Sequence, residues 1–362
     1  MRHKTLFMLP FLILIFLFAM CLGCLDVSTD KEMSVAQAAP VLKIHFLDVG
    51  QADCIFTQLP NGQTILVDSG NNDDASVVTA YLKKQGVKKI DYLIATHPHE
   101  DHIGSMDSII RSFQIGKIFM PKATTTTKAF EDLLLAVKAK GLKINTAKAG
   151  TVVLNQGNLK INFVAPCGSN YDDLNNWSAV TRIQYGNNSF LLMGDAEVLS
   201  EQEILSSGVN IKADVLKVGH HGSSSSTSSS FLKSVKPKYA VISVGTGNKY
   251  GHPHKVTLTK LANAKIQVYR TDRDGTTIVT SDGKNISVKK LGSTIKPRAP
   301  NNGSIAVPAI PGSGKKYIGN KNSKKFHLPS CSVLPAESNR VYFKTREEAI
   351  KAGYIPCKVC NP

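Results

Sequence analysis

The sequence lacks the dense, even set of cysteines that cross-links small secreted domains. Seven cysteines are spread over 362 residues, and Cys54 and Cys167 stand alone, so the pattern is not that of a disulfide scaffold. Cys54 lies in an apolar, strand-like context and is predicted to be a core residue. A second membrane span is also lacking, because only Leu6–Cys21 forms a long apolar run. The length is sufficient for a large core with an appendage.

Residues 1–24 have the pattern of an export signal. Arg2 and Lys4 precede the apolar run, as in the basic and apolar regions of a secretory signal. A Gly-Cys pair then ends at Cys24, which favours lipoprotein processing with Cys24 as the lipidated first residue. The alternatives are an uncleaved N-terminal membrane anchor and cleavage after Ala38. All three predict an exported protein, either secreted or anchored on the outer face of the cell membrane.

Acidic residues are scarce. The chain has 27 Asp and Glu against 44 Lys and Arg, a formal net charge of +17. Residues 291–362 hold 12 basic and 3 acidic residues, so this tail alone carries +9. A basic tail on an exported protein points to a polyanionic partner: DNA, an anionic cell-wall polymer such as teichoic acid, or anionic lipid. The alternative is a basic surface that is only solvated.

Strand and helix patterns alternate along the chain after a polar, Ala-rich spacer at residues 25–40. The predicted strands are Lys43–Asp48, Thr64–Asp68, Tyr92–Thr96, Val180–Tyr185, Phe190–Met193, Val215–Val218, Tyr239–Val244, Gln267–Tyr269 and Thr277–Thr280. The predicted helices are Asp74–Gln85, Ala129–Lys140, Ala196–Ser206 and Val256–Ala262. This alternation over residues 41–290 predicts an α/β (α+β) domain with helices covering sheets. Residues 291–314 have the composition of a linker, and residues 315–362 form a short final module.

The strongest sign of chemistry is a His-x-His-x-Asp-His motif at the end of an apolar strand. His97, His99, Asp101 and His102 follow the apolar residues Tyr92–Ala95. Imidazole nitrogens and carboxylate oxygens are ligands of zinc, manganese and iron. In so tight a loop His97 and His99 can face one ion while Asp101 and His102 face a second. Two ions roughly 3.5–4 Å apart can activate water and take charge from substrate oxygens.

Two further motifs follow apolar strands. Asp195 comes after Phe190–Met193 and is predicted to head a helix, where its carboxylate can bridge two cations or act as an N-cap. His220 and His221 close another strand, and neighbours on an extended chain point in opposite directions. We favour His221 as a ligand of the second ion and His220 as a substrate-facing group. The serine run Ser223–Ser230 is interpreted as a site loop that ends in a helix cap.

The 41–290 region resembles the metallo-β-lactamase-fold hydrolases of the branch that forms the extracellular domain of the ComEC competence proteins. The matching motifs, in order, are Phe46–Asp53, Val67–Gly70, His97–Gly104, Asn175–Ser178, Met193–Asp195, Leu216–Ser223 and Tyr250–His254. The resemblance implies an αββα sandwich with two divalent metal ions at one edge. It also implies that Asp195 bridges the ions and that Asp68 orients the metal loop without binding metal. Asp48, Gln51 and Asp53 are expected to line or brace the same edge, with a plain turn as the alternative.

The sequence departs from most of that superfamily at the first ion. No histidine lies between His102 and His220, and Asn175–Ser178 occupies the stretch where another ligand is expected. Amide and hydroxyl oxygens are harder and weaker ligands than imidazole, so this site is expected to bind zinc less tightly and to accept manganese. Asn176 and Ser178 are therefore candidates to face the substrate. His252 and His254, on a loop bounded by Gly and Pro, are expected at the mouth of the site.

The final module carries a second group of metal-binding residues. His327 and Cys331 are followed by Cys357 and Cys360, four ligands for one structural zinc in a module too small to have a sufficient core. The segment resembles the metal-binding domain of the Ada DNA-repair protein, with His327 where Ada has its first Cys. In Ada that Cys accepts the alkyl group, so methyl transfer is not expected here. A disulfide within the Cys-x-x-Cys pair is the alternative.

These patterns predict an exported, metal-dependent phosphodiesterase, specifically a DNA nuclease. Asp101, Asp195 and His220 are the candidate catalytic residues. The basic tail would raise the local concentration of DNA through phosphate contacts. Two alternatives are a cell-wall phosphocholine or teichoic-acid esterase and a DNA-capture protein without turnover.

Overall fold

A computed structural model describes residues 40–292 and, nearer the C-terminus, residues 317–329, 331, 334, 335, 339–357 and 360. The predicted export signal and nearly all of the predicted spacer and linker lie outside the described residues. The chain divides into two compact units, Met1–Thr294 and Ile295–Pro362. Within the described parts, no helix combines the length and the apolar character needed to span a membrane.

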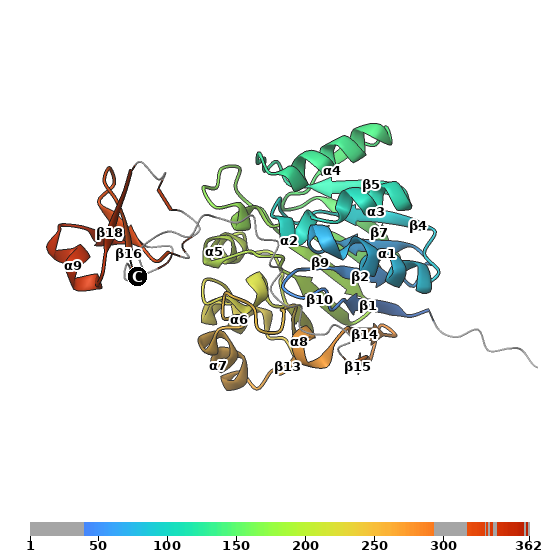
Figure 1. Ribbon diagram of the computed structural model, residues 1–362. Helices are drawn as coiled ribbons and strands as arrows, with labels where there is room; N and C mark the ends of the chain where they lie inside the picture. Colours follow the sequence, from blue (N-terminus) through green and yellow to red (C-terminus); the bar gives the residue numbers. More distant parts are fainter. Residues whose placement is uncertain are drawn as a thin grey trace, which may run out of the picture. The chain divides into compact units, whose positions relative to one another are not determined.

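The first unit is built on two mixed sheets (Figure 1). The eight-stranded sheet has the spatial order β15 (Ile286–Lys290), β14 (Thr277–Ser281), β1 (Leu42–Phe46), β2 (Ile55–Gln58), β3 (Thr64–Val67), β4 (Lys89–Ile94), β5 (Gln114–Met120), β6 (Ile144–Thr146). The seven-stranded sheet has the order β13 (Gln267–Arg270), β12 (Tyr239–Ile242), β11 (Val215–Lys217), β10 (Asn188–Leu192), β9 (Thr181–Tyr185), β8 (Leu159–Phe163), β7 (Val152–Gln156).

Helices cover the outer face of each sheet. Those of the first half of the unit are α1 (Ala75–Lys84), α2 (Glu100–Ile103), α3 (Met106–Ser112) and α4 (Lys128–Ala139). Those of the second half are α5 (Val198–Ser206), α6 (Ser229–Val235), α7 (Lys255–Asn263) and α8 (Thr271–Asp274). Three short 3-10 turns complete the unit: η1 (Asn72–Asp74), η2 (Leu174–Trp177) and η3 (Gly219–Gly222). The result is the αββα sandwich that the resemblance implied.

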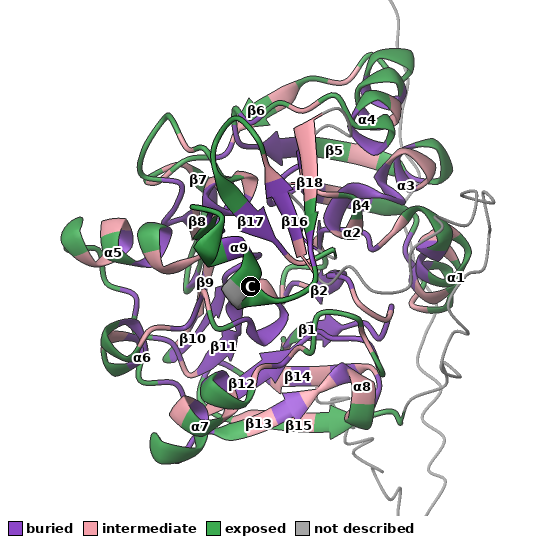
Figure 2. Cartoon of the chain, turned by 60° about the vertical axis from the view of Figure 1, so that its left-hand side comes forward, coloured by how far each residue is buried: buried purple, intermediate pink, exposed green. Residues whose placement is uncertain are grey.

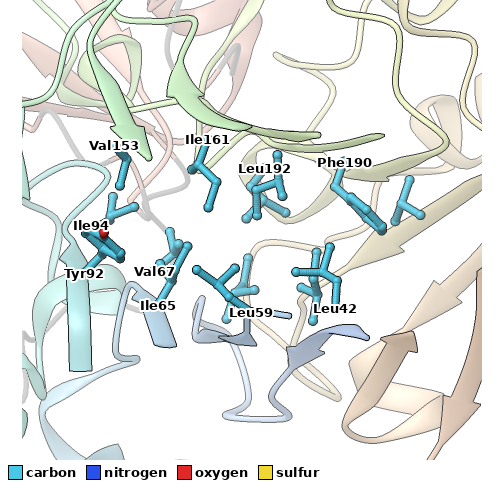
Figure 3. Packing of buried hydrophobic residues seen from close by; sticks show 14 of the residues in the cluster. Leu42, Leu59, Ile65, Val67, Tyr92, Ile94, Val153, Ile161, Phe190 and Leu192 are labelled. Atoms are coloured by element: carbon cyan, nitrogen blue, oxygen red, sulfur yellow. The ribbon is translucent and has the colours of Figure 1, made fainter. Parts of the chain in front are cut away.

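The alternation of side chains along the strands produces three apolar layers. In β3, Ile65 and Val67 point into the layer between the sheets, while Leu66 packs under the helices of the first half. Tyr92 and Ile94 of β4 repeat this pattern, and Figure 3 shows the four side chains facing residues of the second sheet. Apolar residues on both faces explain why these strands read as continuous hydrophobic runs.

Parallel pairing brings the ends of distant strands to one edge. β3 and β4 are parallel, with Val67 opposite Ile94, and β10 and β11 are parallel, with Leu192 opposite Lys217. The carboxyl ends of parallel strands meet at the same edge of a sheet, which is where polar loops can gather. The predicted motifs follow these strands directly.

The predicted strands and helices of the first unit agree with the observed ones to within a few residues. The elements not predicted as separate strands or helices are β2, β5, β6, β7, β8, β15, α2, α3, α6 and α8. Most of them are short, but β5 has seven residues. One helix start was wrong. Asp195 does not head α5, because the helix begins at Val198 and its N-cap is Glu197. The serine run does end in a cap: Phe231 N donates to Ser228 Oγ at the start of α6.

The second unit contains a small four-stranded sheet in the order β18 (Arg340–Phe343), β16 (Tyr317–Asn320), β17 (Lys325–His327), β19 (Ile355–Pro356). One helix, α9 (Arg346–Lys351), packs beside it. Its buried apolar cluster consists of Phe326, Phe343, Ala349 and Tyr354. A core of this size supports a domain only weakly, so an additional tie is needed.

Candidate metal centre

The centre is organised around a buried bond between two loops. Asp68 follows β3 with a left-handed backbone (φ 57°), and its Oδ2 accepts hydrogen bonds from His102 Nδ1 at 2.8 Å and Thr96 Oγ1 at 2.7 Å. Its Oδ1 accepts from Thr96 N at 2.8 Å. Because Nδ1 of His102 is used in this way, Nε2 is left to face the cluster. This is the orienting contact expected of Asp68.

Four of the predicted ligands converge on one point. The ligand atoms of Asp101, His102, Asp195 and His221 all lie within 4.8 Å of one another. Oδ2 of Asp195 lies 3.3 Å from His102 Nε2 and 3.5 Å from His221 Nε2, and Asp101 Oδ2 lies 3.2 Å from His221 Nε2. These are the residues predicted to hold the second ion, and Asp195 Oδ2 approaches the imidazoles of both His102 and His221.

Two further predicted ligands form a separate pair. His97 is fully buried, and its Nε2 lies 2.9 Å from Nδ1 of His99. Nδ1 of His97 faces Thr96 Oγ1 at 3.1 Å, which leaves Nε2 directed at His99. Two imidazole nitrogens facing each other at this distance match the pair predicted for the first ion.

The two adjacent histidines do not point in opposite directions as predicted, because Nε2 of each approaches Asp195 Oδ2, at 3.7 Å for His220 and 3.5 Å for His221. His220 (φ 46°) and His221 (φ 51°) are both left-handed, so the extended chain assumed from the sequence is wrong. Nδ1 of His221 donates to Ser243 O at 2.9 Å, which directs Nε2 into the cluster, while His220 remains one-quarter exposed. Such backbone is costly for residues with a Cβ and collects at functional sites.

Asn176 and Ser178 do not face the substrate side. Asn176 Oδ1 accepts from Ser200 N at 3.3 Å, and the fully buried Ser178 Oγ accepts from Asp195 N at 3.0 Å. Both side chains therefore brace their neighbours, which corrects their predicted role. Asn175 is better placed than these two residues to contact a metal ion or a substrate, because its Oδ1 is buried and has no hydrogen-bond partner among the described residues.

Charges in the cluster depend on one another. Burial alone would lower the pKa of His102, but the carboxylates of Asp195, Asp101 and Asp68 raise it well above its ordinary value. Burial would likewise raise the pKa of Asp195, but His221, His102 and His220 hold it well below its usual range. Asp195 is therefore an anion at neutral pH, in a place that water scarcely reaches.

These residues fit divalent metal. His102 Nε2 lies 3.3 Å from Asp195 Oδ2, and neither this nitrogen nor Asp195 Oδ1 forms a hydrogen bond among the described residues, so both atoms can bind a metal ion. Imidazole and carboxylate together form a ligand set for zinc, manganese or iron. Asp53 and Asp68 also lie near His102, but Asp53 is paired with the ammonium group of Lys217.

A buried lysine is the residue that sequence reasoning missed. Lys217 of β11 is fully buried, and its Nζ lies 2.6 Å from Oδ2 of Asp53, which is also fully buried. The same ammonium donates to Val218 O at 3.0 Å. Asp53 Oδ1 lies 3.5 Å from His221 Nδ1, so the ion pair stands directly behind a ligand. The sequence signal for this buried ion pair was a lysine inside the otherwise apolar strand Val215–Val218.

A second missed residue holds His220. Glu197 Oε1 lies 3.0 Å from His220 Nδ1 and accepts from Ser225 Oγ at 2.6 Å. Burial would raise the pKa of Glu197, but its hydrogen bond with His220 keeps that pKa below the ordinary value. Nε2 of His220 is thereby directed towards Asp195, 3.7 Å from its Oδ2.

Of the remaining predicted residues, His252 lies beside His220, whereas His254 and Asp48 make contacts within their loops. The His252 ring lies against His220, with ring centroids 5.4 Å apart, and burial followed by the charge of His220 lowers the pKa of His252 to about 3. His254 uses its ring nitrogens on Ser224 N and Tyr250 O, so it supports the loop. Asp48 accepts from Gly50 N at 3.4 Å and lies outside the metal cluster, which corresponds to the turn alternative.

Known protein families match both units of the chain. The family described as the metallo-beta-lactamase superfamily matches residues 47–246, more than half of the chain. The chain belongs to the metallo-β-lactamase superfamily. The cluster above lies where the loops of its metallo-β-lactamase domain meet.

The relatives of this metallo-β-lactamase domain place it in the competence-protein branch. It is 34% identical over 251 residues to ComE operon protein 3 of Bacillus subtilis, covering 65% of this chain and 32% of that protein. It is 29% identical over 266 residues to recombination protein 2 of Haemophilus influenzae, covering 71% and 31%. Competence protein ComA of Neisseria gonorrhoeae is 27% identical over 230 residues, covering 63% and 30%. The chain thus spans less than one third of each of these relatives.

The other unit matches the family described as the metal binding domain of Ada over residues 312–362. Ligand atoms of His327, Cys331, Cys357 and Cys360 lie within 4.8 Å of one another, and the first three residues are buried. His327 Nδ1 lies 3.2 Å from Cys331 Sγ, and Leu328 N donates to Cys360 Sγ at 3.4 Å. The cysteines are not joined by disulfides. Burial, then Lys325, lowers the pKa of His327, which favours the neutral ring that a metal requires.

Proposed function

We propose that this protein is an exported, metal-dependent phosphodiesterase that acts on DNA. The observation that carries the proposal is the buried carboxylate of Asp195, which stands between histidine and aspartate ligands and has His220 beside it at a partly exposed position. His220 at the edge of this site can donate a hydrogen bond to an oxygen on which negative charge develops, as in the hydrolysis of a phosphodiester.

Each protein group has a definite task in this reaction. Divalent ions held by the cluster would activate water and offset negative charge on the phosphate. Asp195 and Asp101 supply anionic ligands, and Asp68 fixes the ring of His102. His220, held by Glu197, can donate from Nε2 to a phosphate oxygen as negative charge develops there. His252 narrows the approach to that position.

Three observations support DNA outside the membrane as the substrate. The tail at residues 291–362 carries a formal charge of +9, which suits a phosphate backbone. The relatives are named for competence and recombination. Arg2, Lys4 and the apolar run that follows them support export.

The decisive experiment is hydrolysis by the purified full chain and three variants of it. Plasmid DNA, single-stranded DNA and bis-(p-nitrophenyl) phosphate would each be incubated with manganese, zinc or chelator. We expect cleavage to stop with chelator, and manganese to restore it better than zinc because Asn175–Ser178 replaces a histidine. Asp195→Ala and His221→Ala should lose activity on all three substrates, while Asp48→Asn should keep it. Wild-type rates in Asp195→Ala would refute the two-metal site.

One observation favours a second candidate function, DNA capture without turnover. The pair predicted for the first ion consists of two histidines, His97 and His99. Asn175–Ser178 occupies the stretch in which the superfamily usually supplies a third histidine. If the protein binds DNA but leaves both DNA and the small diester intact with every metal, this function replaces hydrolysis.

A further inference from the structure

A long stretch of the first unit carries positive charge of a single sign. Between Asp214 and Asp272 the sequence has no acidic residue, while it has eight Lys and one Arg. Both loops that contribute histidines at the mouth of the site, His220–His221 and His252–His254, belong to this stretch. Lys217 is buried in its ion pair, and Lys238 and Arg270 pair with the aspartates that bound the stretch, Asp214 and Asp272. The exposed Lys233 and Lys236 are not paired in this way.

Part of this charge lines a groove between two neighbouring helices. Ser229, Leu232 and Lys233 of α6 lie on one side, and Lys260 and Asn263 of α7 lie on the other. Lys236 and Pro237, just after α6, close one end of a volume of ≈ 510 Å³. Figure 2 shows exposed residues on both helices, and Figure 1 shows the two helices next to each other.

One buried carboxylate, that of Glu201, acts on Lys260 of the groove and opposes the lowering of its pKa by burial. Lys233 and Lys236 are exposed and form no ion pair with any residue that the structure describes. The nearby Glu201 is buried, and both of its oxygens accept backbone hydrogen bonds, at 2.5 Å from Thr227 N and 2.9 Å from Ser228 N. Lys260 Nζ donates to Ser226 O at 3.1 Å, which holds the ammonium at the groove while leaving further N–H groups for a ligand.

Both helices start at the metal centre. α6 begins after Ser228, at the end of the loop that carries His220 and His221, and α7 begins after its N-cap His254. The loops are joined by two hydrogen bonds, from Ser224 N to His254 Nδ1 at 2.8 Å and from His254 N to Gly222 O at 3.0 Å. A helix rises about 1.5 Å per residue, so the lining from Ser229 to Lys236 follows α6 for roughly 10 Å, with the last turn of α7 on the other side.

We propose that the groove between α6 and α7 binds the phosphate backbone of a nucleic acid strand that extends from the metal centre. The inference rests on the proposed function and adds the path that a long substrate takes. Successive phosphates of one strand lie about 3.4 Å apart along a duplex, so the groove accommodates about three of them. Its lining contains no aromatic ring, so it contacts phosphates rather than stacking bases and does not select sequence.

The test compares two pairs of exposed lysines in the full chain. The double variant Lys233→Ala and Lys236→Ala removes charge from the groove. The control, Lys83→Ala and Lys84→Ala, removes the same charge from exposed positions at the end of α1. Binding of a labelled 30-nucleotide single strand is measured by anisotropy over a range of salt concentrations without added metal. Hydrolysis of that strand and of bis-(p-nitrophenyl) phosphate is measured with metal.

We expect the groove variant to lower the dependence of log Kd on log salt by about 1.4, since each phosphate contact on a single strand contributes about 0.7. Its cleavage of the strand should slow, while cleavage of the small diester should stay within twofold. The control pair should change neither. Equal losses in both variants would overturn the proposal, as would loss of binding to phosphatidylglycerol vesicles with unchanged binding of the strand.

The outcomes also distinguish this inference from the proposed function. If the wild-type chain hydrolyses neither substrate but the groove variant still loses salt-dependent binding of the strand, the proposed hydrolysis fails and the groove stands. If hydrolysis is confirmed and the groove variant binds and cleaves the strand like the wild type, the groove assignment fails alone. Matching thermal unfolding midpoints establish that both variants are folded.

Discussion

Asp68 Oδ2 and His102 Nδ1 lie 2.8 Å apart, and both side chains are buried. The two residues are separated by 34 positions: Asp68 follows β3, and His102 lies in α2, after the neighbouring parallel strand β4. This bond determines which nitrogen of His102 carries the proton and therefore which one is available to a metal.

Asp68→Asn should weaken metal binding more than it weakens chemistry. The amide keeps the shape of the side chain but loses the charge that holds the ring, and such partners are worth about 10–100-fold in metal affinity. We expect a higher metal concentration to be needed for half-maximal activity, with most activity recovered at saturation. Asp48→Asn is the matched control, because Asp48 lies in a turn outside the cluster. Identical metal titrations for the two variants would remove Asp68 from the centre.

Glu197→Gln should lower the turnover rate by about tenfold or more with little change in KM, because Glu197 orients a group that acts on developing charge. The conservative Glu197→Asp should restore part of the rate. Glu203→Gln on the same helix serves as control, since Glu203 contacts Tyr171 instead. Equal rises in KM for Glu197→Gln and Glu203→Gln would indicate a structural role only.

Lys217→Met should destabilise the fold by about 3–5 kcal/mol, because it leaves the Asp53 carboxylate buried without its cation. The double variant Lys217→Met with Asp53→Leu should recover part of this loss, since neither charge then remains buried. Urea unfolding at neutral pH measures both free energies of unfolding. A single variant as stable as the wild type would mean that Asp53 gains solvent or another partner when the lysine is removed.

Cys360→Ser should reduce the zinc content of the full chain by one ion and loosen the second unit, because a small metal-tied core does not fold alone. Cys167→Ser, which changes an exposed cysteine of the first unit, should keep the zinc content of the wild type. Metal analysis after purification under reducing conditions gives the stoichiometry. Hydrolysis of the small diester should be the same in both variants, and unchanged zinc in Cys360→Ser would refute the ligand set.

Removing residues 291–362 should reduce DNA affinity and leave the chemistry intact. The truncation takes away +9 of formal charge and none of the proposed catalytic residues. Binding of DNA by the full chain should be tighter and should fall more steeply with salt than binding by the truncated chain. Equal salt slopes would assign the tail to another partner, with the anionic cell wall as the first candidate.

Much of the fold could be predicted because its signals are local. Continuous apolar runs in β3 and β4 mark strands that are covered on both faces, and a serine before Phe231 marks a helix start. The His-x-His-x-Asp-His motif identified a metal loop for the same reason, since its residues are neighbours on one strand end. Short elements such as β2 and α3 were missed because few residues carry their pattern.

The sequence by itself therefore determined the strand and helix pattern and the kind of ligand present, and it led to the proposed class of reaction. Only the tertiary structure decided which side chains meet. It pairs Lys217 with Asp53 and Glu197 with His220, and it turns Asn176 and Ser178 inward as braces. The physical reason is that a polar group buried by long-range packing must find a partner in space, and the partner depends on strand order and backbone conformation rather than on neighbours in the chain.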